Sequence, residues 1–88
     1  MSEEHLLNSI ARGDRRAFEE LYRRYYRRLI GYLARRLPSF HSADEIVDNT
    51  FMVVWQHAGE FRYHSQVSTW IFGIAYRVAL KWRLKGSV

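Results

Sequence analysis

Residues 42–59 read SADEIVDNTFMVVWQHAG and predict one amphipathic helix with both of its ends marked. Ser42, followed three residues later by Glu45, has the pattern of a capping box, and Gly59 is a typical helix terminator. Between these limits, apolar positions recur three and four residues apart, as they do along one face of a helix. The expected buried stripe consists of Val47, Thr50, Phe51, Val54 and Ala58. We therefore expect a helix over residues 43–58.

Three further helices are expected around this one. A short helix over residues 4–12 ends at Gly13, and Asp14 can cap a second helix over residues 15–37, which Pro38 stops. The apolar stripe of the second helix comprises Phe18, Leu21, Tyr22, Tyr25, Leu29, Tyr32 and Leu33. A loop at about residues 60–66 precedes a fourth helix over residues 67–85. That helix is expected to bury Ile71, Ile74, Ala75, Val78 and Trp82.

Composition agrees with one small helical domain. The chain has 88 residues, one proline and five glycines, and no segment alternates with period two for long. We expect a single all-α domain over residues 1–88, a compact bundle of about four helices. The absence of cysteine from the sequence excludes disulfides and thiolate metal sites. The longest uncharged run, residues 67–76, is well short of the roughly 20 apolar residues of a spanning helix, so we expect a cytoplasmic, nucleoid-associated protein.

Charge changes sign abruptly along the chain. Every formal charge in residues 41–60 is acidic, whereas every one from residue 61 onward is basic, and the net charge is +5. The acidic residues are Asp44, Glu45, Asp48 and Glu60, and the basic ones are Arg62, Arg77, Lys81, Arg83 and Lys85. Such segregation indicates two neighbouring surfaces, one for a basic partner and one for a polyanion.

The third helix is the candidate for the basic partner. At 100° per residue, its face opposite the buried stripe carries Asp44, Glu45, Asp48, Met52 and Gln56, with Trp55 at the margin. Exposed Met and Trp anchors among steering acids are typical of a docking face. The alternative is that the acids only serve the helix N-terminus and that Trp55 completes the core.

The segment after residue 60 is the candidate for the polyanion. Aromatic rings interleaved with cations suit unstacked nucleic-acid bases and their phosphates. The pattern consists of the run Phe61-Arg62-Tyr63-His64 and, behind it, Trp70, Phe72, Tyr76, Arg77 and Lys81. The alternative here is that Trp70 and Phe72 pack under the loop as part of the core. The arginine rows of the second helix follow Glu19 and Glu20 at ion-pair spacing, and we interpret them as a solvated, salt-bridged face.

Catalysis is not expected. The sequence has no glycine-rich phosphate loop, no cysteine nucleophile and no recognisable catalytic triad. His41, Asp44 and Asp48 imitate a metal site only weakly, because His41 falls before the predicted helix. We expect no enzyme activity, no metal and no cofactor.

Ordered motifs resemble a known family. The run Asp44-Glu45-Ile46-Val47-Asp48-Asn49-Thr50-Phe51 is followed by Val54-Trp55, by Glu60-Phe61-Arg62 and by Ser68-Thr69-Trp70-Ile71-Phe72-Gly73-Ile74-Ala75. With Gly13-Asp14 and Ala17-Phe18-Glu19-Glu20-Leu21-Tyr22 upstream, this order resembles region 2 of bacterial RNA polymerase sigma factors of the extracytoplasmic-function (ECF) class.

The resemblance implies a transcription initiation factor. The third helix would then bind the clamp helices of the polymerase β′ subunit through Asp44, Glu45, Asp48, Met52, Trp55 and Gln56. The loop and fourth helix would recognise and melt the minus-ten promoter element and hold unstacked non-template bases. The residues that the resemblance implies for this contact are Phe61, Arg62, Tyr63, His64, Ser65, Trp70, Arg77 and Lys81. An anti-sigma factor is a further expected partner.

The sequence also departs from the family pattern. Asp48-Asn49 stands where the family usually has Gln followed by Glu or Asp, and Arg77 stands where it usually has Asn. No second helix-turn-helix domain is expected within the sequence after Lys85. The alternative hypothesis is therefore a module of the same fold that binds polymerase or an anti-sigma factor without promoter recognition.

Overall fold

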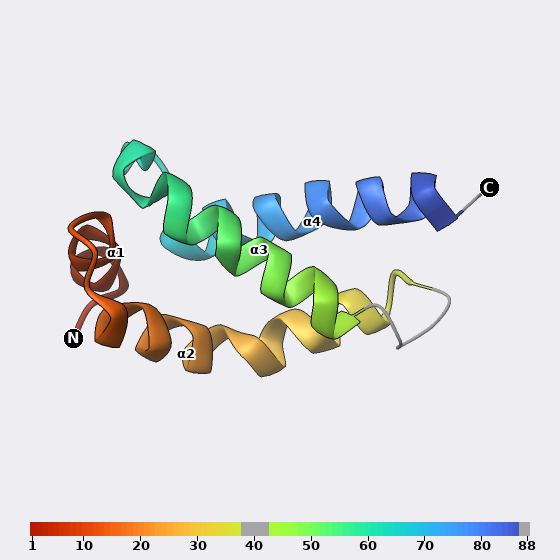
Figure 1. Cartoon of the computed structure of the whole chain (residues 1–88), viewed down its shortest axis with the longest axis horizontal. Coiled ribbons are helices and arrows are strands. Elements are labelled where there is room, and N and C mark those ends of the chain that lie inside the picture. The colour runs from red at the N-terminus through yellow and green to blue at the C-terminus, as the bar shows by residue number, and fades with distance from the viewer. Residues whose placement is uncertain (38–42, 87–88) are drawn as a thin grey trace.

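The computed structural model of the chain describes residues 1–37 and 43–86, with side chains described as far as residue 83. Its elements in these residues are α1 (Glu3–Ala11), α2 (Arg15–Ala34), α3 (Ala43–His57), the short 3₁₀ helix η2 (Ala58–Glu60) and α4 (Val67–Gly86). Figure 1 shows α2 and α4 running along the length of the molecule, with α3 crossing between them and α1 at one end. The expected compact all-α bundle is confirmed.

The beginnings of the first two helices are determined by local hydrogen bonds. The Ser2 hydroxyl accepts from the His5 backbone N–H at 3.1 Å. Asp14 Oδ1 accepts from the backbone N–H groups of Arg16 and Ala17 at 3.0 and 3.2 Å, which confirms Asp14 as the cap of α2. Gly13, between the two helices, has φ +88°, a conformation that favours glycine. The short turn between α1 and α2 therefore depends on these two adjacent residues.

Several helix ends differ from the expected ones, and those of α1 and α4 differ by one residue each. Helix α2 ends at Ala34, three residues early, because the backbone N–H groups of Arg36 and Leu37 both bond to the Leu33 carbonyl and tighten the chain into a turn. Helix α3 ends at His57, and Ala58 instead begins η2. The predicted stop at Pro38, the cap at Ser42 and the residue His41 lie outside the described residues.

The core surrounds α3. Its predicted stripe is buried: Val47, Thr50, Phe51 and Val54 are 0% exposed and Ala58 is 5% exposed. Ile46 is also 0% exposed, so the buried face is wider than one stripe, because α3 contacts both α2 and α4. The Thr50 hydroxyl donates to the Ile46 carbonyl at 2.7 Å, which satisfies the polar group in this apolar setting.

The stripes of the outer helices are buried less evenly. On α2, Leu21, Tyr25, Leu29 and Leu33 are fully buried, whereas the other predicted positions, Phe18, Tyr22 and Tyr32, are half-buried. On α4, Ile71, Ile74 and Ala75 are buried as expected. Val78 and Trp82 are only half-buried, and Ala79 is buried in their place. The C-terminal half of α4 therefore turns a different side toward the core from the one predicted.

Within residues 1–37 and 43–86, no helix combines the length and hydrophobicity needed to cross a membrane.

The cap of α2 yields a stability prediction. Asp14→Ala removes the acceptor of two backbone N–H groups and should lower the free energy of unfolding by about 1 kcal/mol in urea titrations. Asp14→Asn keeps a capping oxygen and should stay within a few tenths of a kcal/mol of the wild type. Equal losses in the two variants would mean that the charge of Asp14, and not its cap, stabilises α2.

Candidate protein and nucleic-acid interfaces

Two tyrosines of α2 hold the acidic face of α3. The Tyr22 hydroxyl donates to Asp48 Oδ1 at 2.8 Å, and the Tyr26 hydroxyl donates to Asp44 Oδ1. The two tyrosines are four residues apart on α2, and the two aspartates that they bind are four residues apart on α3. Both carboxylates remain exposed, so each is oriented by a neighbour and still accessible to a partner.

The electrostatics keep both phenols protonated. Burial, followed by the hydrogen bond to Asp48, raises the pKa of Tyr22 to about 12. The hydrogen bond to Asp44 is the main cause that raises the pKa of Tyr26. A neutral phenol donates a hydrogen bond to a carboxylate and carries no competing charge. Both phenols therefore act as hydrogen-bond donors to the carboxylates of this face.

The other residues predicted for this face gather beside the two acids. Met52 is 57% exposed, and Glu45 and Gln56 are also exposed. Trp55 is half-buried and packs edge-on against Phe18, with ring centroids 5.3 Å apart. Trp55 therefore contributes to the core and also borders the exposed face. We call the set Asp44, Glu45, Asp48, Met52, Trp55 and Gln56 the acidic face.

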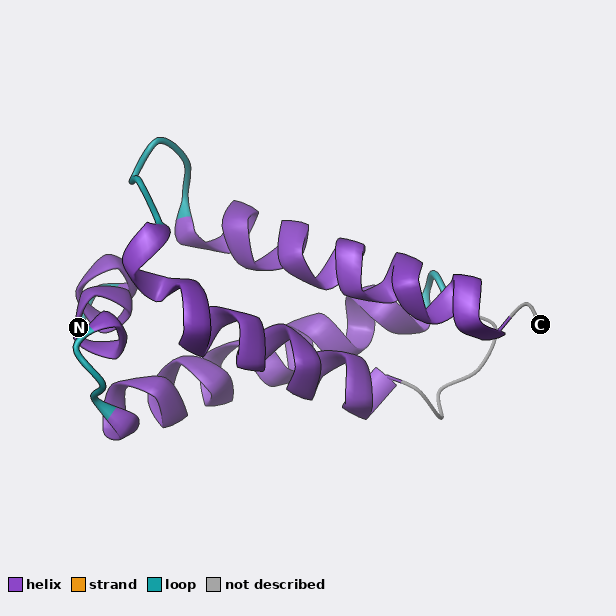
Figure 2. Ribbon diagram, turned by 45° about the horizontal axis from the view of Figure 1, so that its top comes forward, coloured by secondary structure: helices purple, strands orange, loops and turns teal. Residues whose placement is uncertain are grey.

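The basic segment forms an exposed loop. Figure 2 shows the loop between η2 and α4 projecting at one end of the bundle. Arg62, Tyr63, His64 and Ser65 are all exposed, and Tyr63 is 54% exposed. Tyr63 has φ +62°, which is uncommon for a residue with a side chain and costs conformational energy. A strained backbone thus holds an aromatic ring in solvent.

Phe61 does not have the exposure expected of a base-contacting residue. It is 6% exposed, and its ring lies 4.7 Å from that of Tyr63 and 5.4 Å from that of Trp70. Because Phe61 is buried, its ring is unavailable for stacking on a base, and the expectation for this residue is corrected to a supporting role beneath the loop. Trp70 is half-buried, which leaves part of its ring at the surface.

Two cations of α4 belong to the predicted nucleic-acid residues. Arg77 and Lys81 are both exposed. Lys81 lines a groove of about 320 Å³ between α3 and α4, together with Met52 and Trp82. Lys81 therefore approaches the acidic face, whereas the loop residues lie at the other end of α4. Trp70, Arg77 and Lys81 are spaced seven and four residues apart and therefore follow one side of α4.

The remaining contacts of α2 and α4 agree only in part with the expectations from sequence. Arg28 was interpreted as part of a solvated face, but its guanidinium carbon lies 4.5 Å from the ring centre of Tyr25 and 5.5 Å from that of Phe72. Phe72 is half-buried, as the core alternative expected. Glu20 pairs with Arg24 at 2.9 Å, as the four-residue spacing predicted, but Arg23 pairs with Glu20 at 3.4 Å and not with Glu19. The matched spacing of Tyr22 and Tyr26 with Asp48 and Asp44 was the one available signal for that pairing.

A search of the described part of the chain finds no group of three metal-binding side chains close enough to hold an ion. The third member of the weak metal pattern, His41, lies outside that part.

Comparisons with known proteins agree on one family. Residues 21–87 match the family Sigma-70 region 2. The chain is 34% identical over 68 residues to RNA polymerase sigma factor YlaC of Bacillus subtilis, covering 77% of the chain and 39% of that protein. It is 32% identical over 79 residues to ECF RNA polymerase sigma factor SigM of Mycobacterium tuberculosis, covering 90% of the chain and 40% of that protein. The chain thus spans about two fifths of the length of these curated relatives.

A solved structure has the same fold. The NMR structure of an engineered region 2 of sigmaE in complex with GTAAAA aligns with a TM-score of 0.88 at 23% sequence identity. The alignment covers 99% of this chain and 90% of the other.

The tyrosine–carboxylate pairing predicts a measurable titration. Asp48→Asn removes a negative charge that disfavours the phenolate, so the pKa of Tyr22 should fall from about 12 toward its usual value near 10. The pKa of Tyr22 is higher in the folded chain than in the unfolded one, so the neutral phenol contributes to the stability of the fold. That contribution is complete below about pH 10 and is lost as the pH rises toward 12. Ultraviolet titration of phenolate absorbance checks the shift, with Tyr22→Phe identifying the transition. If Asp48→Asn leaves that transition in place, burial alone raises the pKa.

Proposed function

The chain belongs to the Sigma-70 region 2 family, and on this premise we propose that it binds core RNA polymerase and holds the minus-ten promoter element open. The observation that carries the DNA part is the exposed Tyr63 ring, held at positive φ in a loop with Arg62. Strained conformations persist where the surrounding structure enforces them, often at binding sites. The strained loop would hold the Tyr63 ring in the position in which it captures an unstacked base.

The loop has the chemistry for single-stranded DNA. An exposed aromatic ring stacks on any base that has left the duplex, and this interaction is worth about 1 to 3 kcal/mol per base. The buried Phe61 supports the Tyr63 ring from below, and the exposed part of Trp70 offers a second aromatic surface. Arg62 and Arg77 supply cations for phosphates. That the sigmaE region 2 of the same fold was solved in complex with GTAAAA supports this assignment.

The acidic face is proposed to bind the clamp helices of the polymerase β′ subunit. Exposed carboxylates attract and orient a basic partner, while Met52 supplies an apolar anchor. The hydrogen bonds from Tyr22 and Tyr26 restrict Asp48 and Asp44 before binding. Less side-chain entropy is then lost in the complex. An anti-sigma factor that competes for this surface, and a cytoplasmic location at the nucleoid, follow from the proposed role.

The polymerase contact predicts a charge-reversal effect. Asp48→Lys should weaken binding to a β′ clamp-helix fragment by about 1 to 3 kcal/mol in calorimetric titration. Because this change also breaks the bond to Tyr22, Glu45→Lys is the companion variant and should weaken binding in the same direction. Glu4→Lys reverses an exposed charge on α1 and is the matched control, expected to leave affinity unchanged. If Asp48→Lys and Glu45→Lys bind the fragment as tightly as the Glu4→Lys control and the wild type, the acidic face is not the polymerase contact.

The DNA contact predicts a preference for open strands. With the chain bound to core polymerase, Tyr63→Ala should lose about 1 to 3 kcal/mol of affinity for the single-stranded non-template minus-ten sequence, and Tyr63→Phe should retain it. Tyr63→Gly should lose the same affinity and gain stability, since glycine relieves the positive φ. Replacing Arg62 or Arg77 should reduce the salt slope by about 0.7 each.

The controls separate DNA binding from folding. Circular dichroism melting of each variant establishes that the fold is intact. Equal binding of duplex and single-stranded DNA, together with a silent Tyr63→Ala, would leave the alternative of a polymerase-binding module without promoter recognition.

A further inference from the structure

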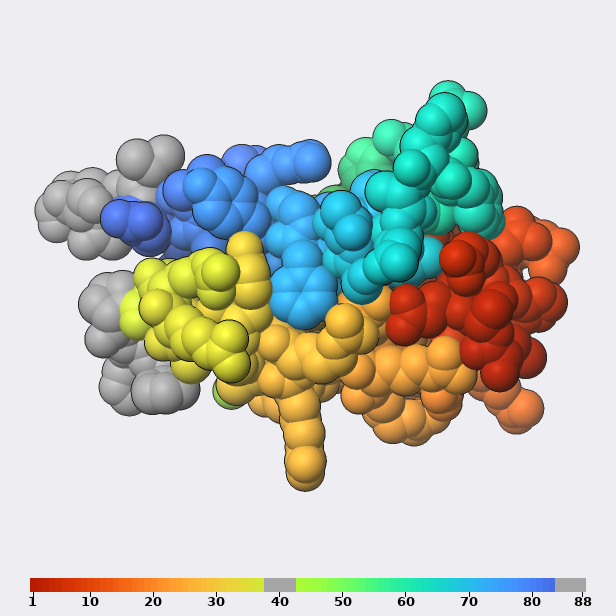
Figure 3. Space-filling view, turned by 180° about the vertical axis from the view of Figure 1, so that it is seen from behind, coloured from red at the N-terminus to blue at the C-terminus, as the bar shows by residue number. Residues whose placement is uncertain are grey.

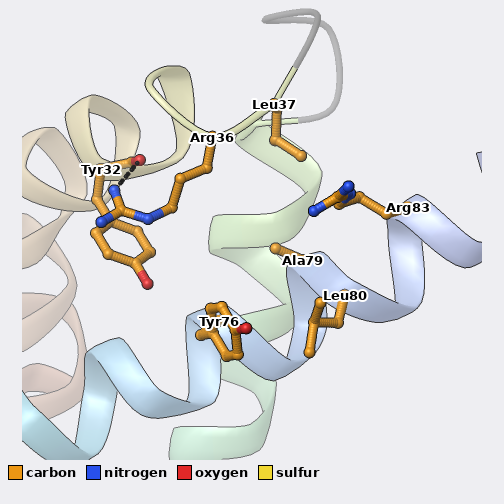
Figure 4. Close-up of a pocket in the computed structure, with 7 residues that line it drawn as sticks. All are labelled: Tyr32, Arg36, Leu37, Tyr76, Ala79, Leu80 and Arg83. Carbon is orange, nitrogen blue, oxygen red and sulfur yellow. Dashed lines mark hydrogen bonds between the residues drawn. The ribbon is translucent and has the colours of Figure 1, made fainter.

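A small cleft opens between the C-terminal end of α2 and the C-terminal half of α4. Its volume is about 190 Å³. Figure 4 shows Tyr32 and Arg36 on the α2 side of this cleft and Tyr76, Leu80 and Arg83 on the α4 side. Tyr76 is 51% exposed and Leu80 is 38% exposed, so large apolar surfaces border the cleft and face solvent. The function proposed above uses none of these residues.

The cleft combines fixed aromatic and cationic groups. The guanidinium carbon of Arg36 lies 3.8 Å from the ring centre of Tyr32, and Arg36 Nη1 donates to the Tyr32 carbonyl at 3.0 Å. A guanidinium has five N–H donors, so this bond leaves Arg36 with further capacity while fixing its position. Among the described residues that line the cleft, none is acidic. An aromatic group with a negative charge is the ligand that these features suit.

Helix α4 connects the cleft to the loop that carries Tyr63: the loop precedes the helix, and the cleft borders its C-terminal half. Ten residues separate Trp70 from Leu80, a rise of about 15 Å along α4. Phe72 packs edge-on against Tyr32 of the cleft lining, with ring centroids 5.0 Å apart, and the Arg28 guanidinium carbon lies 5.5 Å from the Phe72 ring centre. Figure 3 shows this side of the molecule, where the loop, α4 and the end of α2 follow one another across one surface. A strand leaving the loop along α4 would cross aromatic and basic groups before it reached the cleft.

We propose that the cleft binds one unstacked nucleotide of a single strand, with its base against Tyr76 and Leu80 and its phosphate at Arg36. This inference rests on the proposed function, because the strand is the one that the loop would hold. A free nucleotide has the same chemistry, but it lacks the attachment that raises its local concentration. An amphipathic helix would need anchor sites repeated along a groove, whereas this cleft accommodates one ring system.

The first test uses strand length. Fluorescence anisotropy of single-stranded minus-ten oligonucleotides, extended by one to six nucleotides at either end, should show a rise in affinity at one end once the strand reaches the cleft. The rise should be about fivefold or more and should be absent from Tyr76→Ala. Tyr76→Phe keeps the ring and should retain it. A mononucleotide should bind far more weakly, and equally tight mononucleotide binding would overturn the assignment to a strand.

The arginines supply a matched pair of controls. Arg36→Ala should reduce the gain from extension, whereas Arg35→Ala removes the same charge one residue away, outside the cleft lining, and should preserve it. Equal effects of the two changes would show general attraction to the phosphates and would overturn the cleft as a site. Unchanged gain in both Tyr76→Ala and Arg36→Ala would overturn it too.

A residue-level readout separates this inference from the proposed function. Amide chemical shifts of the 88-residue chain are followed on addition of the extended oligonucleotide. Changes at both the loop around Tyr63 and the cleft around Tyr32 and Tyr76 are expected. Changes at the loop alone would overturn the cleft and spare the loop assignment, while changes at the cleft alone would overturn the loop assignment and spare the cleft. Saturation of the cleft by an acidic helical peptide, with no effect of the oligonucleotide, would also overturn the inference.

Discussion

The burial of one face of α3 is the constraint on which the rest of the structure depends. Val47, Phe51 and Val54 are completely excluded from solvent, because α2 and α4 both pack on this helix. At 100° per residue, burying this face leaves the opposite one outside. The rotation of α3 therefore determines which residues reach solvent, and it presents Asp44, Asp48 and Met52 together. The acidic face is a direct consequence of how the core is packed.

Local features of the fold could be predicted from sequence, because they depend on neighbours along the chain. The cap at Asp14 and the stripe of α3 each require only residues within a turn or two. The pairing of Tyr22 with Asp48 joins positions 26 residues apart, and their matched spacing within each helix does not say that the two helices pack side by side. The burial of Phe61 was missed for a related reason. Its sequence neighbours are polar and exposed, while the rings that cover it come from the loop and from α4.

The end of α4 shows where a periodic pattern misleads. A spacing of three and four residues predicts a buried stripe through Val78 and Trp82 as readily as one through Ala79, because all three residues are apolar. Ala79 is the buried one, and it lines the cleft with Tyr32 and Leu37, where α2 ends in a tight turn. The choice between the stripes thus depends on contacts with a distant helix, which spacing along α4 cannot supply. Tyr76 and Leu80 line the same cleft and stay exposed.

The two candidate surfaces differ in stiffness, and their proposed partners account for the difference. The acidic face is built on a helix, and its carboxylates are held by phenols of a second helix, so its geometry is fixed before any partner arrives. A folded protein surface rewards such fixed geometry, since less entropy is lost on binding. Bases that leave a duplex have no fixed arrangement, and a loop can adapt to them as a helix cannot. The loop still holds one element rigidly: Phe61 supports the Tyr63 ring from the core. A short loop that presents one anchored, exposed aromatic ring is the arrangement that the proposed capture of a mobile base requires.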